Sequence, residues 1–136
     1  MTKKAKKINP KAQLEFKVLR LNNKLKELSD KIKRAPTQYK DHVKKDSKME
    51  SYQYKQSNIK NYLEELNLLL EDINVGLIPQ STLSIVPKTT LERKIEQSDF
   101  AETLFEGEYI TAIKILNYPS EEIIFIALTP LSNFSS

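Results

Sequence analysis

An unbroken heptad stripe near the start of the chain constrains its fold more than any other feature. Apolar residues recur there at alternating spacings of four and three, at Leu14, Val18, Leu21, Leu25, Leu28 and Ile32. This spacing places their side chains on one face of an α-helix, where they need an apolar partner. Asn9 is a good N-cap and Pro10 suits the first helical position, so we expect the helix to begin there.

A second helix is predicted after a polar loop at about residues 35–46. Pro36 disfavours continuation of the first helix, and Ser47 with Glu50 forms a capping box that would open the second. Gly76 can take the left-handed position after its last residues, with Leu77 folding back as its apolar partner. The stripe on the inner face of this second helix comprises Met49, Tyr52, Gln56, Ile59, Leu63, Leu66, Leu70 and Ile73, of which Gln56 is polar.

These patterns predict a mainly α fold with a long antiparallel helical hairpin or coiled coil over residues 10–76. A basic flexible tail (1–9) precedes it, and an extended linker (77–88) with two prolines follows it. Residues 89–136 are expected to form a small C-terminal interaction module.

The secondary structure of the C-terminal module is open to two interpretations. Thr89 with Glu92 and Asp99 with Glu102 resemble capping boxes of short helices. The apolar runs within residues 108–129 fit either two helices or a β-hairpin with strands at 109–116 and 123–128, because short runs cannot be typed by periodicity alone. We favour helices; the alternative is an α+β fold with a C-terminal β-hairpin at about 108–129.

One short motif resembles a known family. The segment LFEGEYITAIKIL is similar to the turn between the paired helices of a tetratricopeptide repeat, with Gly107, Tyr109, Ala112 and Ile113 at the matching positions. The resemblance covers about a dozen residues and implies two paired helices there. No second copy recurs at the period of about 34 residues that such repeats need, so the chain is not assigned to the family.

The residues that catalysis or metal binding requires are scarce. The chain has no Cys and a single histidine, His42, placed in the polar loop, which leaves no Cys-based or His-rich metal site. The carboxylate pairs Glu64-Glu65, Glu71-Asp72 and Glu121-Glu122 are explained by solvated helix faces or element starts. No phosphate-binding glycine motif occurs. We therefore expect no enzyme activity, cofactor, metal or small-molecule substrate.

Charge is distributed very unevenly along the chain. Residues 1–60 carry 18 Lys or Arg against 6 Asp or Glu, whereas residues 61–136 carry 4 against 12. Lysine-rich clusters bind phosphate backbones by releasing counterions, without base-specific geometry. Possible nucleic-acid contacts are therefore Lys3, Lys4, Lys6, Lys7, Lys31, Lys33, Arg34, Lys40, Lys44 and Lys45.

Helix-to-helix association with another protein is the leading functional hypothesis. The apolar stripes are wider than a two-stranded seam requires, which predicts a surface left for a partner. The predicted partner-binding residues are Leu14, Phe16, Val18, Leu19, Leu21, Leu25, Leu28, Ile32, Leu63, Leu66, Leu69, Leu70 and Ile73.

We thus expect a non-catalytic subunit or scaffold of a multiprotein assembly, with a heterologous helical subunit as partner. The alternative is an accessory protein that binds DNA or RNA through residues 3–45. With no signal-like start and no run of about 20 apolar residues, we expect no membrane contact and an intracellular location, in the nucleus rather than the cytoplasm.

Overall fold

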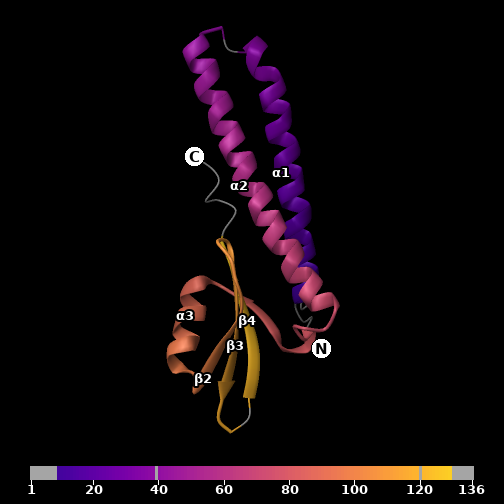
Figure 1. Cartoon of the computed structure of the whole chain (residues 1–136), viewed down its shortest axis with the longest axis vertical. Coiled ribbons are helices and arrows are strands. Elements are labelled where there is room, and N and C mark those ends of the chain that lie inside the picture. Colours follow the sequence, from indigo (N-terminus) through magenta and orange to yellow (C-terminus); the bar gives the residue numbers. More distant parts are fainter. Residues whose placement is uncertain (1–8, 39, 120, 130–136) are drawn as a thin grey trace, which may run out of the picture.

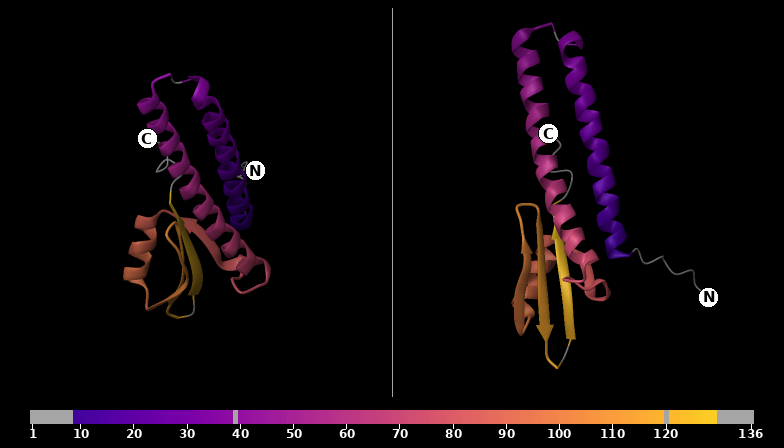
Figure 2. Two further views of the ribbon diagram at one scale, coloured as in Figure 1. Left: turned by 45° about the horizontal axis from the view of Figure 1, so that its top comes forward. Right: turned by 45° about the vertical axis from the view of Figure 1, so that its right-hand side comes forward.

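The computed structural model, which describes residues 9–38, 40–119 and 121–129, consists of a long helical hairpin and a four-stranded sheet (Figure 1). Helices α1 (Pro10–Gln38) and α2 (His42–Asn74) run antiparallel. The hairpin packs on one face of the sheet, and a short helix, α3 (Lys88–Gln97), covers the other face (Figure 2). At one end the hairpin projects beyond the sheet, and at the other end the sheet extends beyond the hairpin.

Helix α1 begins as predicted but ends later than expected. The side chain of Asn9 accepts a hydrogen bond from the N–H of Lys11 at 2.8 Å, which caps the first turn. The helix continues through Pro36 to Gln38. Because only Thr37 and Gln38 follow the proline within the helix, the hydrogen bond that it removes interrupts little helical structure.

Helix α2 begins five residues before the predicted capping box. The carboxylate of Asp41 accepts hydrogen bonds from the N–H groups of Val43 and Lys44 at 2.9 and 3.4 Å, so Asp41 and not Ser47 is the N-cap. The connection between the helices is therefore shorter than the predicted loop at 35–46. The two predicted helices themselves are confirmed.

The end of α2 follows the predicted left-handed cap. Gly76 has a φ of 87°, and the N–H of Leu77 donates to the carbonyl of Asp72 at 2.9 Å. The expected return of the Leu77 side chain into the core is wrong, because that side chain is 72% exposed. Ile78, only 3% exposed, takes the apolar position instead.

The sheet is built from the remainder of the chain. A 3₁₀ turn, η1 (Gln80–Thr82), leads into strand β1 (Leu83–Val86), so the expected linker contributes an edge strand. The other strands are β2 (Phe100–Glu106), β3 (Ile110–Asn117) and β4 (Glu121–Leu128). Their spatial order is β1-β4-β3-β2, with β1 and β4 parallel and the other neighbours antiparallel. Helix α3 connects the two edge strands.

The preference for helices after residue 98 is wrong, and the β-hairpin alternative at 108–129 is correct. Strands β3 and β4 pair over their whole lengths, with Ile110 opposite Leu128 and Asn117 opposite Glu121. The Asp99 capping box is also wrong, because strand β2 begins at Phe100. The segment that resembles a tetratricopeptide repeat is therefore two strands and a turn. Helix α3 confirms the short helix predicted near Thr89, but its N-cap is Pro87 without a side-chain hydrogen bond, so the predicted Thr89 capping box is wrong.

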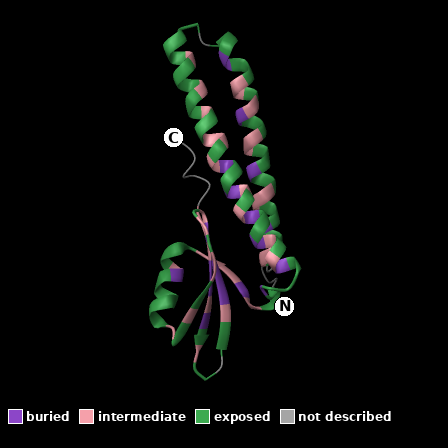
Figure 3. Ribbon diagram, viewed as in Figure 1, coloured by how far each residue is buried: buried purple, intermediate pink, exposed green. Residues whose placement is uncertain are grey.

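Both faces of the sheet are covered over part of their area, and this produces two clusters of buried residues (Figure 3). Residues of β3 and β4 alternate between the faces. Those facing the helical hairpin are Ile110, Ala112, Ile124 and Ile126. Those facing α3 are Ile113, Ile115, Phe125 and Ala127, which pack with Leu91. The first cluster joins the hairpin to the sheet. Sheet residues on the same face that lie beyond this cluster stay exposed.

Candidate interaction site

A carboxylate on α2 holds the turn between β2 and β3. Glu65 accepts hydrogen bonds from three consecutive backbone N–H groups, those of Glu108, Tyr109 and Ile110, at 2.8, 2.9 and 3.1 Å. A charged acceptor makes such bonds stronger than neutral ones. A Cβ atom at Gly107 would lie 2.3 Å from the Glu65 carboxylate, so only glycine permits this approach. The contact attaches the hairpin to one end of the sheet.

Two tyrosines complete this joint between the hairpin and the sheet. The rings of Tyr62 on α2 and Tyr109 are stacked, with centroids 5.0 Å apart and planes 10° from parallel. The Tyr62 hydroxyl donates to the carbonyl of Thr129, just after β4. Burial, together with the charge of Glu65, raises the pKa of Tyr62 well above its ordinary value, so this hydroxyl remains a donor.

The joint leaves the opposite end of the same sheet face uncovered (Figures 1 and 3). Three large apolar side chains are exposed at that end: Phe100 at 58%, Leu116 at 36% and Tyr118 at 87%. Phe100 on β2 lies directly opposite Leu116 on β3. Leu116 shares a sheet face with Ala112, which packs under the hairpin, because residues two apart point to the same side. We call Phe100, Leu116 and Tyr118 the sheet-end surface.

The backbone around the sheet-end surface is held by Asp99. Its N–H donates to the carbonyl of Leu116 at 3.1 Å and to the side-chain oxygen of Asn117 at 3.3 Å. Its carboxylate accepts a hydrogen bond from the N–H of Tyr118. These bonds tie the start of β2 to the turn after β3. The backbone segments that carry the three apolar side chains are therefore hydrogen-bonded to one another.

Charged residues border the sheet-end surface on its inner side. Lys114 lies between Glu102 on β2 and Glu122 on β4, with N···O distances of 3.3 and 3.5 Å. Its hydrogen bond to Glu102 and the charges of both carboxylates raise the pKa of Lys114 above its ordinary value. With Asp99 and Glu121 nearby in sequence, this end of the sheet carries four acidic side chains and one lysine. The border of the surface is therefore acidic.

Most of the predicted partner-binding residues lie inside the chain's own core. Phe16 and Leu19 are the exceptions, since they remain 58% and 54% exposed on the outer side of α1. The fully buried members can meet another protein only if the hairpin opens. Leu14, Leu21, Leu28, Leu66, Leu69 and Ile73 are buried, and Val18, Leu25, Ile32, Leu63 and Leu70 are partly buried.

The predicted nucleic-acid contacts are divided by the structure. Lys3, Lys4, Lys6 and Lys7 lie outside the described residues. The others gather where α1 ends and α2 begins, and we call them, with Lys48, the hairpin tip (Figure 1). The tip comprises Lys31, Lys33, Arg34, Lys40, Lys44, Lys45 and Lys48. Pro10, where α1 begins, lies 21 residues before Lys31, the first residue of the tip, which is about 32 Å along the helix at about 1.5 Å per residue.

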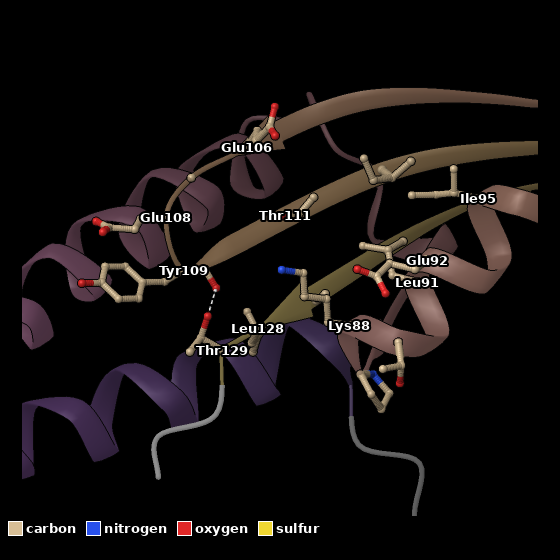
Figure 4. Close-up of a pocket in the computed structure, with 15 residues that line it drawn as sticks. Lys88, Leu91, Glu92, Ile95, Glu106, Glu108, Tyr109, Thr111, Leu128 and Thr129 are labelled. Atoms are coloured by element: carbon tan, nitrogen blue, oxygen red, sulfur yellow. Dashed lines mark hydrogen bonds between the residues drawn. The ribbon is translucent and has the colours of Figure 1, made fainter. Parts of the chain in front are cut away.

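A groove of about 670 Å³ lies beside α3, on the sheet face away from the hairpin (Figure 4). Leu91, Ile113 and Ala127 form its apolar part, and Lys88 and Glu92 are among its charged residues. Its lining contains neither Cys nor His, and its hydroxyl groups have no imidazole base beside them. His42 is remote from it, at the turn between α1 and α2. The groove lining therefore contains no hydroxyl–imidazole or thiol–imidazole pair.

Two other classes of site receive no support within the part of the chain that the structure describes. No group of three or more His, Cys, Asp or Glu residues there could hold a metal ion. Likewise, none of the described helices combines the length and the apolar character that a membrane span needs.

Comparisons with models of protein families, with curated proteins and with solved structures find no match for this chain. The geometry of the chain itself must therefore carry the functional argument.

Sequence reasoning found the basic clusters but missed the sheet-end surface and the Glu65 contact. The sequence favours helices for both segments, the one after Asp99 that contains Phe100 and the one within 108–129 that contains Leu116. Their meeting depends on strand register, which local patterns do not specify for strands buried on both faces. Gly107 was a usable signal, because a glycine between two strands often marks a close approach of another group.

Proposed function

We propose that the chain is a non-catalytic subunit that docks onto a partner protein through the sheet-end surface. The observation that carries this proposal is the register pair Phe100 and Leu116, exposed near Tyr118 at the end of the sheet face that the hairpin leaves uncovered. Adjacent exposed aromatic and aliphatic side chains are typical anchors of protein interfaces, where a few such residues supply most of the binding energy.

The chemistry of the border defines the kind of partner. Glu102, Glu122 and Asp99 surround the apolar side chains with negative charge, and Lys114 is already engaged by the first two. A complementary surface would pack an apolar side chain against Phe100 and Leu116 and place lysine or arginine at the rim. The partner is thus a heterologous protein with a basic border around an apolar centre.

The heptad side chains have a different role in this proposal. Leu14, Leu21 and Leu28 stabilise the hairpin from inside, since each is at most 1% exposed. The hairpin then acts as a scaffold that orients the sheet. Of the side chains that the sequence predicted for helix-face docking, Phe16 and Leu19 alone are exposed while the hairpin stays closed.

Site-specific photo-crosslinking in cells tests the proposal. A photoreactive phenylalanine analogue replaces Tyr118 in one variant and Tyr54, which is 69% exposed on α2, in a matched control. We expect one protein to crosslink at position 118 and not at position 54. Phe100→Thr with Leu116→Thr should abolish that crosslink, because threonine keeps strand propensity but removes the apolar anchors.

The partner identified by crosslinking, once purified, should also bind the wild-type chain directly. It should bind the variant with both threonine substitutions at least about tenfold more weakly. The proposal is overturned if position 118 crosslinks to no protein, or if the product persists in the threonine variant. Crosslinks from position 118 to the chain itself would indicate a second copy as the occupant and would equally contradict a heterologous partner.

A further inference from the structure

The hairpin tip gathers positive charge that the fold does not neutralise. Residues 31–50 contain seven Lys or Arg against three Asp or Glu. Among the described residues, the ion pairs are those of Lys24 with Glu27 and of Lys114 with Glu102 and Glu122, and none of them involves the tip. Lys33, Arg34, Lys40, Lys44 and Lys48 are all exposed.

The tip side chains are held on ordered helix ends. Lys33 and Arg34 lie on the last turns of α1, while Lys44 and Lys48 are four residues apart on one face of α2. The Asp41 cap fixes the first turn of α2. The positive charges of the two helices are therefore concentrated at one end of the hairpin, away from the acidic sheet.

We infer that the hairpin tip binds the phosphate backbone of duplex nucleic acid, independently of base sequence. A polyanion releases condensed counterions when lysines replace them, and this release favours binding without any apolar contact. The tip has the matching composition. Val43, 77% exposed, is its one large exposed apolar side chain among the described residues, so it lacks the apolar centre of a protein interface.

The dimensions of the tip indicate how it meets a duplex. Two packed helices with their side chains are roughly 20 Å across, whereas the major groove is about 12 Å wide. The tip therefore lies across the backbone and does not enter the groove as a single recognition helix would. This geometry predicts phosphate contacts without base readout.

The tip is also poorly suited to single strands. Single-strand binding relies on aromatic side chains on which bases stack. Between residues 31 and 50 the sequence has one aromatic residue of the Phe, Tyr or Trp type, Tyr39, which lies outside the described residues, and the nearby Tyr52 ring is covered by the Lys31 ammonium at 5.8 Å. Stacking of successive bases needs several such rings, so a duplex is the favoured ligand.

Fluorescence anisotropy with a labelled DNA duplex of about 20 base pairs, titrated with the full chain at several salt concentrations, tests the inference. The tip variant carries Lys33→Gln, Arg34→Gln and Lys44→Gln. Its control, Lys11→Gln with Lys26→Gln and Lys60→Gln, removes the same charge from positions along the two helices outside the tip. A third variant, with Lys3, Lys4, Lys6 and Lys7 replaced by glutamine, measures the contribution of residues outside the described structure.

We expect the tip variant to lose affinity on the order of tenfold or more, and the slope of log affinity against log salt to fall by about 3. The control should change affinity about twofold or less, and scrambling the duplex sequence should have no effect. Equal losses in the tip and control variants would overturn the inference, as would binding that disappears only in the third variant.

A polyglutamate peptide of equal charge distinguishes the two kinds of polyanion. The inference requires it to compete poorly with the duplex, because its charges lack the fixed spacing of a phosphate backbone. Competition as effective as that of unlabelled duplex would reassign the tip to an acidic protein. Because these readouts use only the duplex and a synthetic peptide, they are independent of the crosslinking experiment at Tyr118.

Discussion

Replacement of Glu65 tests the joint on which the exposed sheet-end surface depends. Glu65→Ala removes the acceptor for the N–H groups of Glu108, Tyr109 and Ile110. Glu108 is exposed and its N–H can bond to water, but Ile110 is 1% exposed and Tyr109 is partly buried. Two shielded donors left without their charged acceptor cost about 1–3 kcal/mol each before relaxation, so we expect a loss of about 3 kcal/mol.

Urea unfolding followed by circular dichroism measures this loss. For a chain of this length, about 3 kcal/mol corresponds to a decrease in melting temperature of roughly 10 °C. The matched control is Glu64→Ala, which removes an exposed neighbouring carboxylate that makes no hydrogen bond or ion pair with the described residues. This substitution should change stability by about 0.5 kcal/mol or less. The denaturant slope should be unchanged in both variants, because the folded and unfolded surfaces are the same.

A double-mutant cycle with Gly107→Ala tests whether Glu65 and Gly107 act together. In the wild-type background the new Cβ meets the Glu65 carboxylate at 2.3 Å, so we expect a loss of about 1–3 kcal/mol from displacing it. In the Glu65→Ala background that clash is absent, and the second substitution should cost much less. Additive losses within about 0.5 kcal/mol would mean that the two residues act independently and would refute the joint.

Two further predictions concern the packing of the hairpin and the joint. Leu21→Ala should destabilise the chain by about 2–5 kcal/mol, because Leu21 is fully buried. Phe16→Ala, on the outer side of the same helix, should cost about 0.5 kcal/mol or less. Equal losses of stability in chemical denaturation would contradict the observed helix faces. Tyr62→Phe should cost about 1–2 kcal/mol, since it leaves the Thr129 carbonyl without this donor, and an unchanged unfolding midpoint would argue against that bond.

The helical hairpin was predictable because its determinants are local. The heptad stripe, the Asn9 cap and the Gly76 end each act within a few residues, and the structure contains all three. The error in the loop also has a local cause. Two capping residues, Asp41 and Ser47, compete to begin α2, and the pattern of Ser47 with Glu50 does not reveal that the earlier one is used.

The C-terminal module was harder because β3 and β4 are covered on both faces. Ile113 and Ile115 pack toward α3, while Ile110 and Ala112 pack toward the hairpin, so the strand shows no alternation of apolar and polar residues. Capping-box patterns such as Asp99 with Glu102 also occur by chance in strands. Glu102 instead faces Lys114 across the β2–β3 pair.

The two candidate interaction surfaces differ in the same way, because one depends on local sequence and the other on contacts between distant residues. The hairpin tip was visible as clusters of lysines, and a predicted hairpin was enough to bring them together. The sheet-end surface required the register of Phe100 with Leu116 and the place where the hairpin stops covering the sheet. Both depend on contacts between residues distant in sequence, which a single sequence does not specify.

Affinity capture of the tagged chain from its own cells, with nuclease treatment and high-salt washes, tests the proposed docking most directly. The wild-type chain is compared with Phe100→Thr/Leu116→Thr and with Phe16→Gln/Leu19→Gln. We expect one stoichiometric protein that survives nuclease and salt, is lost from the threonine variant and is retained by the glutamine variant. A partner lost only from the glutamine variant, or one released by nuclease, would contradict docking at the sheet-end surface.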